Sequence, residues 1–228
     1  MGELGDIQAV AFDIDGTLYE TWKFNTRIVF HFLAHSHFFL HYGLVRSALR
    51  KDKAEGDFPR IQAEYMARRL RTTPEKAQEA LDKIVYQGLK KYFIKITPCE
   101  NAVDCVIRLK EKGIKVAILS DFPPEQKGEL WGIKNLADLS MGTEECGALK
   151  PNPMAFEIMA KKLGIKPENI LYVGNSYKYD VAGSKAAGMK SAWFTSKRNA
   201  KKKKDKNNEL ADIRFSNYAD LMQVLGLN

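Results

Sequence analysis

Two carboxylates directly follow a short apolar run near the start of the chain. Residues 9–12, AVAF, precede residues 13–18, DIDGTL, so Asp13 and Asp15 stand where an apolar segment ends. A continuous apolar run is typical of a parallel strand that is covered on both faces. Ligands gather at the carboxyl ends of strands in open α/β sheets. The pattern therefore predicts a buried strand that holds a nucleophile and a neighbouring acid, a pair suited to phosphoryl transfer.

The same D-x-D-G turn also occurs within calcium-binding loops. Such a loop has a bidentate Glu six residues after its Gly, whereas Trp22 stands six residues after Gly16. We therefore set a calcium site aside.

Three further candidates lie at the ends of later predicted segments. Ser120 and Asp121 end the apolar run 114–121, IKVAILSD, where a hydroxyl could hydrogen-bond a phosphate oxygen or simply end a strand. Lys150 stands just ahead of the tripeptide PNP, a Pro-braced helix start that holds the Lys near one place. Its positive charge suits a phosphoryl group, although the spacing alone fits a surface Lys equally well.

A fourth segment, residues 173–189, has the sequence VGNSYKYDVAGSKAAGM. It combines the end of a predicted strand, a Gly, several polar groups and a predicted helix. Asn175 and Asp180 supply oxygen atoms of the kind that Mg²⁺ prefers. An amide oxygen brings no charge, so Asn175 is either a weak ligand or the mark of a lost metal site.

These four segments, in this order, resemble the four motifs of the haloacid dehalogenase-like (HAD) hydrolase superfamily, in its phosphatase branch with a small helical cap. The match covers nearly all of the chain outside residues 20–95, and those residues match nothing specific. The family usually places Asp where this chain has Asn175.

The resemblance implies a role for each candidate residue. Asp13 would attack phosphorus and form an aspartyl-phosphate, while Asp15 would protonate the leaving alkoxide and then activate water. Ser120, Asp121 and Lys150 would bind the phosphoryl group. Mg²⁺ would be the cofactor, and its ligands would be Asp13, the backbone carbonyl of Asp15, Asn175 and Asp180.

The elements that must position these residues alternate between strands and helices. This alternation predicts an α/β fold with a doubly wound parallel sheet. Residues 20–95 are expected to be all-helical. Residues 22–50 form either one long helix or two, with Gly43 as the main weak point, and a later helix runs from Pro74 to about Tyr92. The length of this insert predicts a subdomain. The resemblance implies a Rossmann-like core of residues 1–19 and 96–228, with residues 20–95 inserted after the first strand as a helical cap domain.

Composition bounds the compartment and the partners. The three cysteines are scattered and no signal sequence is found, which predicts a cytoplasmic protein. The sequence contains no run of 18 apolar residues, so a membrane-spanning helix is not predicted. The net charge of +8 is concentrated in residues 197–206, which carry seven Lys or Arg and one Asp. One local tract is expected to be a solvated loop rather than a nucleic-acid surface. The expected partner is a small phosphorylated metabolite, and the oligomeric state stays open.

All four histidines fall between residues 31 and 41, in two pairs spaced four apart. Such pairs can chelate a metal on one helix face. No carboxylate or cysteine accompanies them, and phenylalanines surround them, so packed or substrate-facing histidines are favoured over a zinc site.

Three alternatives to a phosphatase can be weighed against these residues. A dehalogenase would use the same nucleophile but has no use for an acid at Asp15. A phosphomutase acting on a sugar phosphate is compatible with a cap of unknown specificity. A non-catalytic or weakened binding protein on the same fold is suggested by Asn175.

Overall fold

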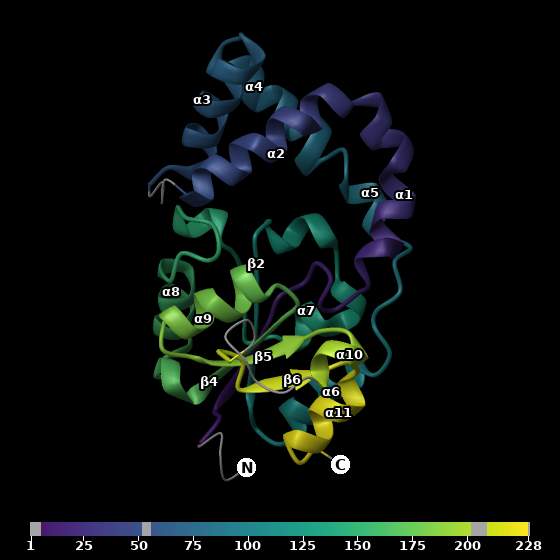
Figure 1. Cartoon of the computed structure of the whole chain (residues 1–228), viewed down its shortest axis with the longest axis vertical. Coiled ribbons are helices and arrows are strands. Elements are labelled where there is room, and N and C mark those ends of the chain that lie inside the picture. The colour runs from purple at the N-terminus through teal and green to yellow at the C-terminus, as the bar shows by residue number, and fades with distance from the viewer. Residues whose placement is uncertain (1–5, 52–55, 202–208, 228) are drawn as a thin grey trace.

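Six parallel strands form one sheet at the centre of the molecule. The computed structural model describes residues 6–51, 56–201 and 209–227. Within them the strand order is β3-β2-β1-β4-β5-β6 (Figure 1). The strands are β1 Ala9–Phe12, β2 Lys115–Ser120, β3 Leu139–Gly142, β4 Ile170–Gly174, β5 Lys190–Phe194 and β6 Ile213–Phe215. The predicted doubly wound parallel sheet is therefore confirmed.

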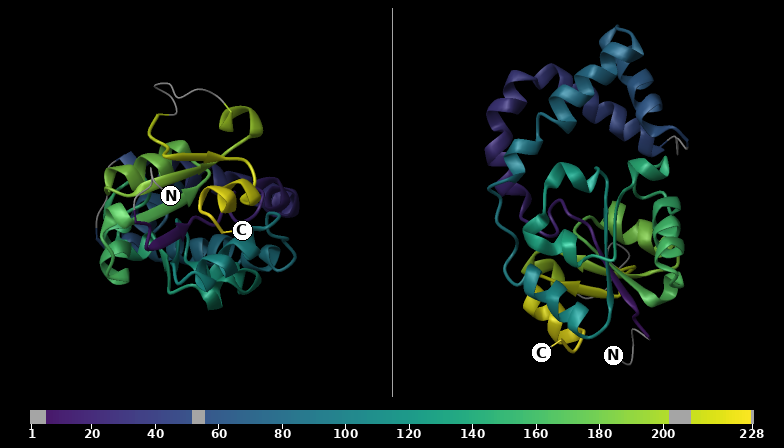
Figure 2. Two further views of the ribbon diagram at one scale, coloured as in Figure 1. Left: turned by 90° about the horizontal axis from the view of Figure 1, so that it is seen from below. Right: turned by 180° about the vertical axis from the view of Figure 1, so that it is seen from behind.

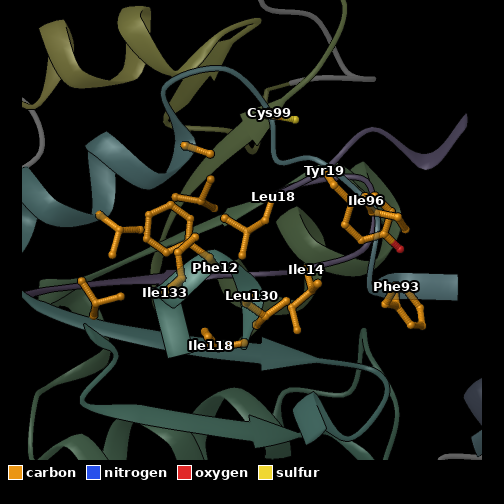
Figure 3. Close-up of a cluster of buried hydrophobic side chains, with 14 of the residues drawn as sticks. Phe12, Ile14, Leu18, Tyr19, Phe93, Ile96, Cys99, Ile118, Leu130 and Ile133 are labelled. Atoms are coloured by element: carbon orange, nitrogen blue, oxygen red, sulfur yellow. The ribbon is translucent and has the colours of Figure 1, made fainter. Parts of the chain in front are cut away.

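Strand β1 lies in the middle of the sheet and pairs with β2 on one side and β4 on the other. Its residues alternate between two buried clusters: Val10 and Phe12 belong to one, and Ala9 and Ala11 to the other. Figure 3 shows Phe12 packed near Leu18 and Ile118 in the first cluster. Burial on both faces is the physical reason for the continuous apolar run.

Helices cover both faces of this sheet (Figure 2). Helix α8 contributes side chains to the cluster of Ala9 and Ala11, whereas α6 and α11 contribute to the cluster of Val10 and Phe12. The helices of this part of the chain are α6 Ala102–Glu111, α7 Ile133–Leu136, α8 Met154–Leu163, α9 Ala182–Ala186, α10 Lys197–Ala200 and α11 Tyr218–Val224. Residues 202–208, which include much of the predicted basic loop, lie outside the described residues.

A separate group of helices stands beyond the carboxyl edge of the sheet, at the top of Figure 1. They are α1 Thr21–Ala34, α2 Ser36–Lys51, α3 Phe58–Leu70, α4 Pro74–Leu81 and α5 Lys90–Phe93. The chain enters this group directly after β1 and leaves it before α6, so the helices lie on the side of the sheet where Asp13 emerges.

The first of these helices breaks at a different residue from the one predicted. Gly43 lies inside α2, and the break falls at His35, where α1 and α2 meet at an angle of 112°. Helix α1 buries no residue, whereas α2 buries an apolar stripe that includes Phe38 and Leu49. The bend turns that stripe toward its neighbours, and tertiary packing therefore decides the break rather than glycine.

The predicted helix from Pro74 to about Tyr92 is also interrupted. Helix α4 ends at Leu81, a π-helical turn follows over Asp82–Tyr86, and α5 begins at Lys90. In this turn the carbonyl oxygens of Val85 and Tyr86 accept hydrogen bonds from Gln126 Nε2, at 2.7 and 3.3 Å. These contacts with the sheet part of the molecule outweigh the local preference for a continuous helix.

The described helices differ from membrane-spanning helices in length and composition. None of them alone has both the length and the apolar character to cross a membrane; α1 and α2 meet those criteria only as a bent pair.

Candidate active site

Asp13 occupies the topological switch point of the sheet, because the strand order reverses between β1 and β4. Its backbone N–H donates to Val173 O at 2.9 Å, which extends the strand pairing by one residue. The buried carboxylate accepts from Lys150 Nζ at 2.7 Å through Oδ1 and from Thr17 Oγ1 at 3.0 Å through Oδ2. The turn that follows contains Gly16 in the left-handed region, with φ of 82°. A side chain at Gly16 would overlap Asn175, so glycine permits this close approach.

Lys150 joins the ends of two strands. Its buried Nζ donates to Asp13 Oδ1 and to Asp180 Oδ1, both at 2.7 Å, and to the hydroxyl of Tyr172 at 3.1 Å. The Tyr172 hydroxyl in turn donates to Leu119 O at 2.8 Å. All three hydrogens of the ammonium are therefore used, and the charge is held in one place.

Burial and charge oppose each other in this group. Burial raises the pKa of Asp13 to about 7, assisted by Asp180 and Asp15 and opposed by Lys150. Burial alone would lower the pKa of Lys150, but Asp13 and Asp180 outweigh it and hold that pKa well above its usual value. When both carboxylates are ionised, they exceed the charge of one ammonium, so the site favours an additional cation.

The segment after β4 brings Asn175 and Asp180 to the same edge. The Ser176 hydroxyl accepts from Tyr179 N at 3.2 Å, and the Ser176 N–H donates to Asp180 Oδ2 at 2.8 Å. Asn175 Oδ1 lies 3.5 Å from Thr17 Oγ1, and the backbone oxygen of Asn175 accepts from Trp193 Nε1 at 3.0 Å. The first and fourth sequence segments therefore converge, since they follow neighbouring parallel strands.

Asp15 faces a different partner. Its side chain, 33% exposed, accepts through Oδ1 from Lys127 Nζ at 2.5 Å and from the Tyr19 hydroxyl. The ammonium of Lys127 also lies over the ring of Phe93, 4.0 Å from its centroid. Figure 3 shows Tyr19 and Phe93 near each other on the right-hand side of the apolar cluster. Sequence reasoning missed Lys127, because it lies in a short turn that matches none of the motifs.

Ser120 and Asp121, at the end of β2, have different surroundings. Ser120 is fully buried, and its Oγ accepts from Phe122 N at 3.5 Å. Asp121 forms an ion pair with Arg50 and accepts from Thr143 Oγ1 at 3.0 Å. Burial alone would raise the pKa of Asp121, but Lys150, Arg50 and Arg46 outweigh it and lower that pKa to about 2. Asp121 thus ties the end of β2 to α2 and to Thr143, and it also lines the cavity described next.

These side chains surround a cavity of about 300 Å³, the size of a small-molecule site. Both the sheet part and the helical part contribute to its wall. Its lining consists of Asp13, Asp15, Tyr19, Thr21, Phe24, Leu89, Phe93, Asp121, Phe122, Gln126, Lys127, Lys150, Asn175, Ser176, Tyr179 and Asp180. Ser120 is absent from this lining, although it was predicted to bind phosphate.

Beside the cavity, a buried polar cluster joins the helical part to the sheet part. Arg46 of α2 forms an ion pair with Glu144 and donates to Gln62 Oε1 at 3.2 Å. The Tyr86 hydroxyl donates to Glu144 Oε2 at 2.8 Å and accepts from Gln62 Nε2 at 2.8 Å. Arg50, also on α2, donates to the backbone oxygen of Lys150. The cluster fixes α2 against the loop that presents Lys150.

The histidines form two contacting pairs. The rings of His31 and His35 lie 4.8 Å apart, and those of His37 and His41 lie 4.5 Å apart. Nowhere in residues 6–51, 56–201 and 209–227 do three or more His, Cys, Asp or Glu side chains gather as metal ligands. His31 Nε2 lies 2.9 Å from Ile84 O, as expected for a packed histidine.

The molecule is an α/β protein whose parallel sheet carries a buried carboxylate, Asp13, at its switch point, beside the ammonium of Lys150. Residues 7–188 match the family model of the haloacid dehalogenase-like hydrolases. The chain belongs to this family, which confirms the resemblance of the sequence motifs.

Similar proteins carry several names. A glyceraldehyde 3-phosphate phosphatase from Methanopyrus kandleri is 28% identical over 80% of this chain and 82% of its own. Pyrophosphatase PpaX from Halalkalibacterium halodurans is 30% identical over 82% of this chain and 83% of its own. Among solved structures, a HAD phosphatase from Thermococcus onnurineus is 22% identical, covers 96% of this chain and 98% of its own, and has a TM-score of 0.62. An L-2-haloacid dehalogenase from Xanthobacter autotrophicus is 18% identical over the same shares, with a TM-score of 0.66.

Proposed function

We propose that this protein is a Mg²⁺-dependent phosphatase that hydrolyses a small phosphomonoester through an aspartyl-phosphate on Asp13. The observation that carries the proposal is the buried Asp13 carboxylate, held by Lys150 and Thr17 at the wall of a small cavity. Relatives named glyceraldehyde 3-phosphate phosphatase, pyrophosphatase and phosphoglycolate phosphatase support it. The dehalogenase-like structures share the fold, but Asp15 favours chemistry that needs a general acid.

The proposed reaction has two displacements at phosphorus. Asp13 attacks phosphorus, and the bond to the leaving oxygen breaks as Asp15 gives that oxygen a proton. Asp15 then takes a proton from water, whose oxygen attacks the same phosphorus and releases Asp13 with inorganic phosphate. Covalent catalysis divides one difficult displacement into two easier ones. Lys150 orients Asp13 throughout and offsets the charge of the phosphoryl oxygens.

The donor set fits Mg²⁺, because every candidate ligand is an oxygen. Asp13, the backbone carbonyl of Asp15 and Asn175 would hold the ion, with Asp180 in support. When bound, the ion supplies positive charge that offsets the two carboxylates and the phosphate dianion. Lys150 forms ion pairs with Asp13 and Asp180, so its ammonium and the bound ion would together offset the negative charges of these two carboxylates.

The pH dependence of turnover should depend on the Mg²⁺ concentration. With a pKa of about 7, Asp13 is increasingly protonated as the pH falls below neutrality, and a protonated carboxyl is no nucleophile. Mg²⁺ and the proton compete for the same carboxylate, so more Mg²⁺ should move the acidic limb of kcat/KM to lower pH. Profiles recorded at limiting and at saturating Mg²⁺ measure this shift. Identical acidic limbs would show that Asp13 does not bind the ion.

Asn175→Asp tests the departure from the usual family motif. The added charge should lower the Mg²⁺ concentration for half-maximal activity by about tenfold, equivalent to about 1.4 kcal/mol. Turnover at saturating Mg²⁺ need not rise, because the new charge also repels phosphate. A Mg²⁺ titration of both proteins with one aryl phosphate measures the change, and Asn152→Asp provides a control at the nearby PNP turn. An unchanged dependence would mean that Asn175 is not a ligand.

We also propose that residues 20–95 act as a cap that selects the substrate. Thr21, Phe24, Leu89 and Phe93 come from this segment and line the cavity. A panel of phosphomonoesters, assayed for phosphate release with and without Mg²⁺, tests the proposed function. Release from none of them would favour a binding protein, and transfer of the phosphoryl group to a sugar phosphate would favour a phosphomutase.

A further inference from the structure

Lys127 places a second buried ammonium in the wall of the cavity. Its side chain is 3% exposed and reaches the site from the turn Pro124–Lys127 after β2. Its only polar partner among the described residues is Asp15 Oδ1, at 2.5 Å. Lys127 also lines an adjoining cavity of about 290 Å³ that continues past Phe93 and Trp131.

Three phenylalanines surround this ammonium. Its Nζ lies 4.0 Å from the ring centroid of Phe93, 5.2 Å from that of Phe122 and 5.8 Å from that of Phe24. The rings of Phe24 and Phe93 stack on each other, with centroids 4.4 Å apart. Ring faces attract a cation but replace few of the hydrogen bonds that water gives an ammonium.

The two lysines of the cavity differ in how their donors are used. An ammonium has three N–H donors. Lys150 directs all three to Asp13, Asp180 and Tyr172. Lys127 directs one to Asp15 and has two left, although it is nearly as deeply buried. Unused donors on a buried charge are costly, and an acceptor that enters the cavity would satisfy them.

We propose that Lys127 is a second anion subsite and that the substrate is a short phosphomonoester with a further anionic group, either a carboxylate or a second phosphate. The inference rests on the proposed phosphatase function and names its substrate class. Asp15 contacts Lys127 directly and lies two residues from Asp13, so the second anion would be separated from the transferring phosphoryl group by a few bonds. The phenylalanine rings would pack against the short carbon skeleton in between.

Binding of non-hydrolysable phosphonates tests the subsite without turnover. Calorimetry at one fixed excess of Mg²⁺ compares methylphosphonate with phosphonoacetate, which adds a carboxylate, and with methylenediphosphonate, which adds a second phosphonate. Wild-type protein should bind phosphonoacetate or methylenediphosphonate, which carry a second anionic group, about tenfold more tightly than methylphosphonate. Lys127→Met should remove that preference. Comparing the two proteins with the same ligand cancels its chelation of Mg²⁺. The stronger of the two ligands identifies the anion.

Matched variants make the result specific. Lys134→Met removes a Lys of helix α7 that pairs with Glu125, two residues before Lys127, at 3.7 Å, and it should leave the preference unchanged. Lys127→Gln is a second neutral variant in case the Met variant unfolds, and Lys127→Arg should keep most of the preference. Equal affinity of wild-type protein for all three phosphonates, or a preference that survives in both neutral variants, would overturn the subsite.

Turnover separates this inference from the proposed function. Lys127→Met should lower kcat/KM for 2-phosphoglycolate or a bisphosphate about tenfold more than for ethyl phosphate, whose alkyl group carries no second anionic group. Equal losses would mean that Lys127 acts only through Asp15, and the subsite would be rejected while the phosphatase stands. Selective phosphonate binding without hydrolysis of any phosphomonoester would reject the phosphatase while the subsite stands.

Discussion

Asp13→Asn is expected to lower kcat for phosphomonoester hydrolysis by about 10⁴-fold or more, the scale of losing a catalytic nucleophile. An amide cannot attack phosphorus in place of the carboxylate. Lys150 keeps its contacts with Asp180 and Tyr172, so the fold should survive the substitution. Phosphate release measured with an activated aryl phosphate and saturating Mg²⁺ gives the loss.

The matched control for this prediction is Asp104→Asn on α6. Asp104 pairs with Arg108 on the same helix, on the surface of the sheet part, and does not line the cavity. Its substitution should leave kcat unchanged. Activity of the Asp13→Asn protein within tenfold of wild type would remove the covalent mechanism.

Arg46→Met is expected to lower the free energy of unfolding by about 3–5 kcal/mol, the usual cost of removing one partner from a buried ion pair. Glu144 would stay buried, and among the described residues only the Tyr86 hydroxyl would then donate to it from a side chain. The Glu144 side chain is only 5% exposed, and this burial raises its pKa. Methionine fills much of the volume beside Phe122, whose ring centroid lies 4.7 Å from the guanidinium carbon. The loss is therefore electrostatic rather than a packing defect.

Urea unfolding of wild-type protein and three variants measures this effect. Arg60→Met removes a surface pair with Glu64, where Arg60 is 75% exposed, and should cost less than about 1 kcal/mol. The double variant Arg46→Met/Glu144→Met should recover much of the loss, because no charge is then left unpaired. A cost for Arg46→Met no greater than that for Arg60→Met would contradict the structural role of the cluster.

The parts of the site that sequence predicts are those that follow strands. Asp13, Asn175 and Asp180 converge because β1 and β4 are adjacent and parallel, and an apolar run that ends in a polar group marks both strands. The contact between Asp13 and Lys150 spans 137 residues and followed only from the resemblance of the motifs. No local pattern encodes such a distance.

The parts that sequence does not predict depend on tertiary packing. Lys127 becomes a buried cavity residue because Phe24 of α1 and Phe93 of α5 pack over it together with the nearby Phe122. The Arg46–Glu144 pair joins residues 98 positions apart, and neither belongs to a motif. The break at His35 likewise follows from the burial of α2, whereas Gly43 offered the stronger local signal.

Trapping of the phosphorylated protein tests the central claim most directly. Asp15→Asn should form the aspartyl-phosphate with an activated aryl phosphate, which needs no proton, and should hydrolyse it slowly because the general base is missing. Acid quenching after mixing with ³²P-labelled substrate, followed by peptide mass spectrometry, locates the label. We predict nearly stoichiometric label on the peptide that contains Asp13 and none in the Asp13→Asn protein. Phosphate release without labelled protein, or label on another residue, would contradict the account.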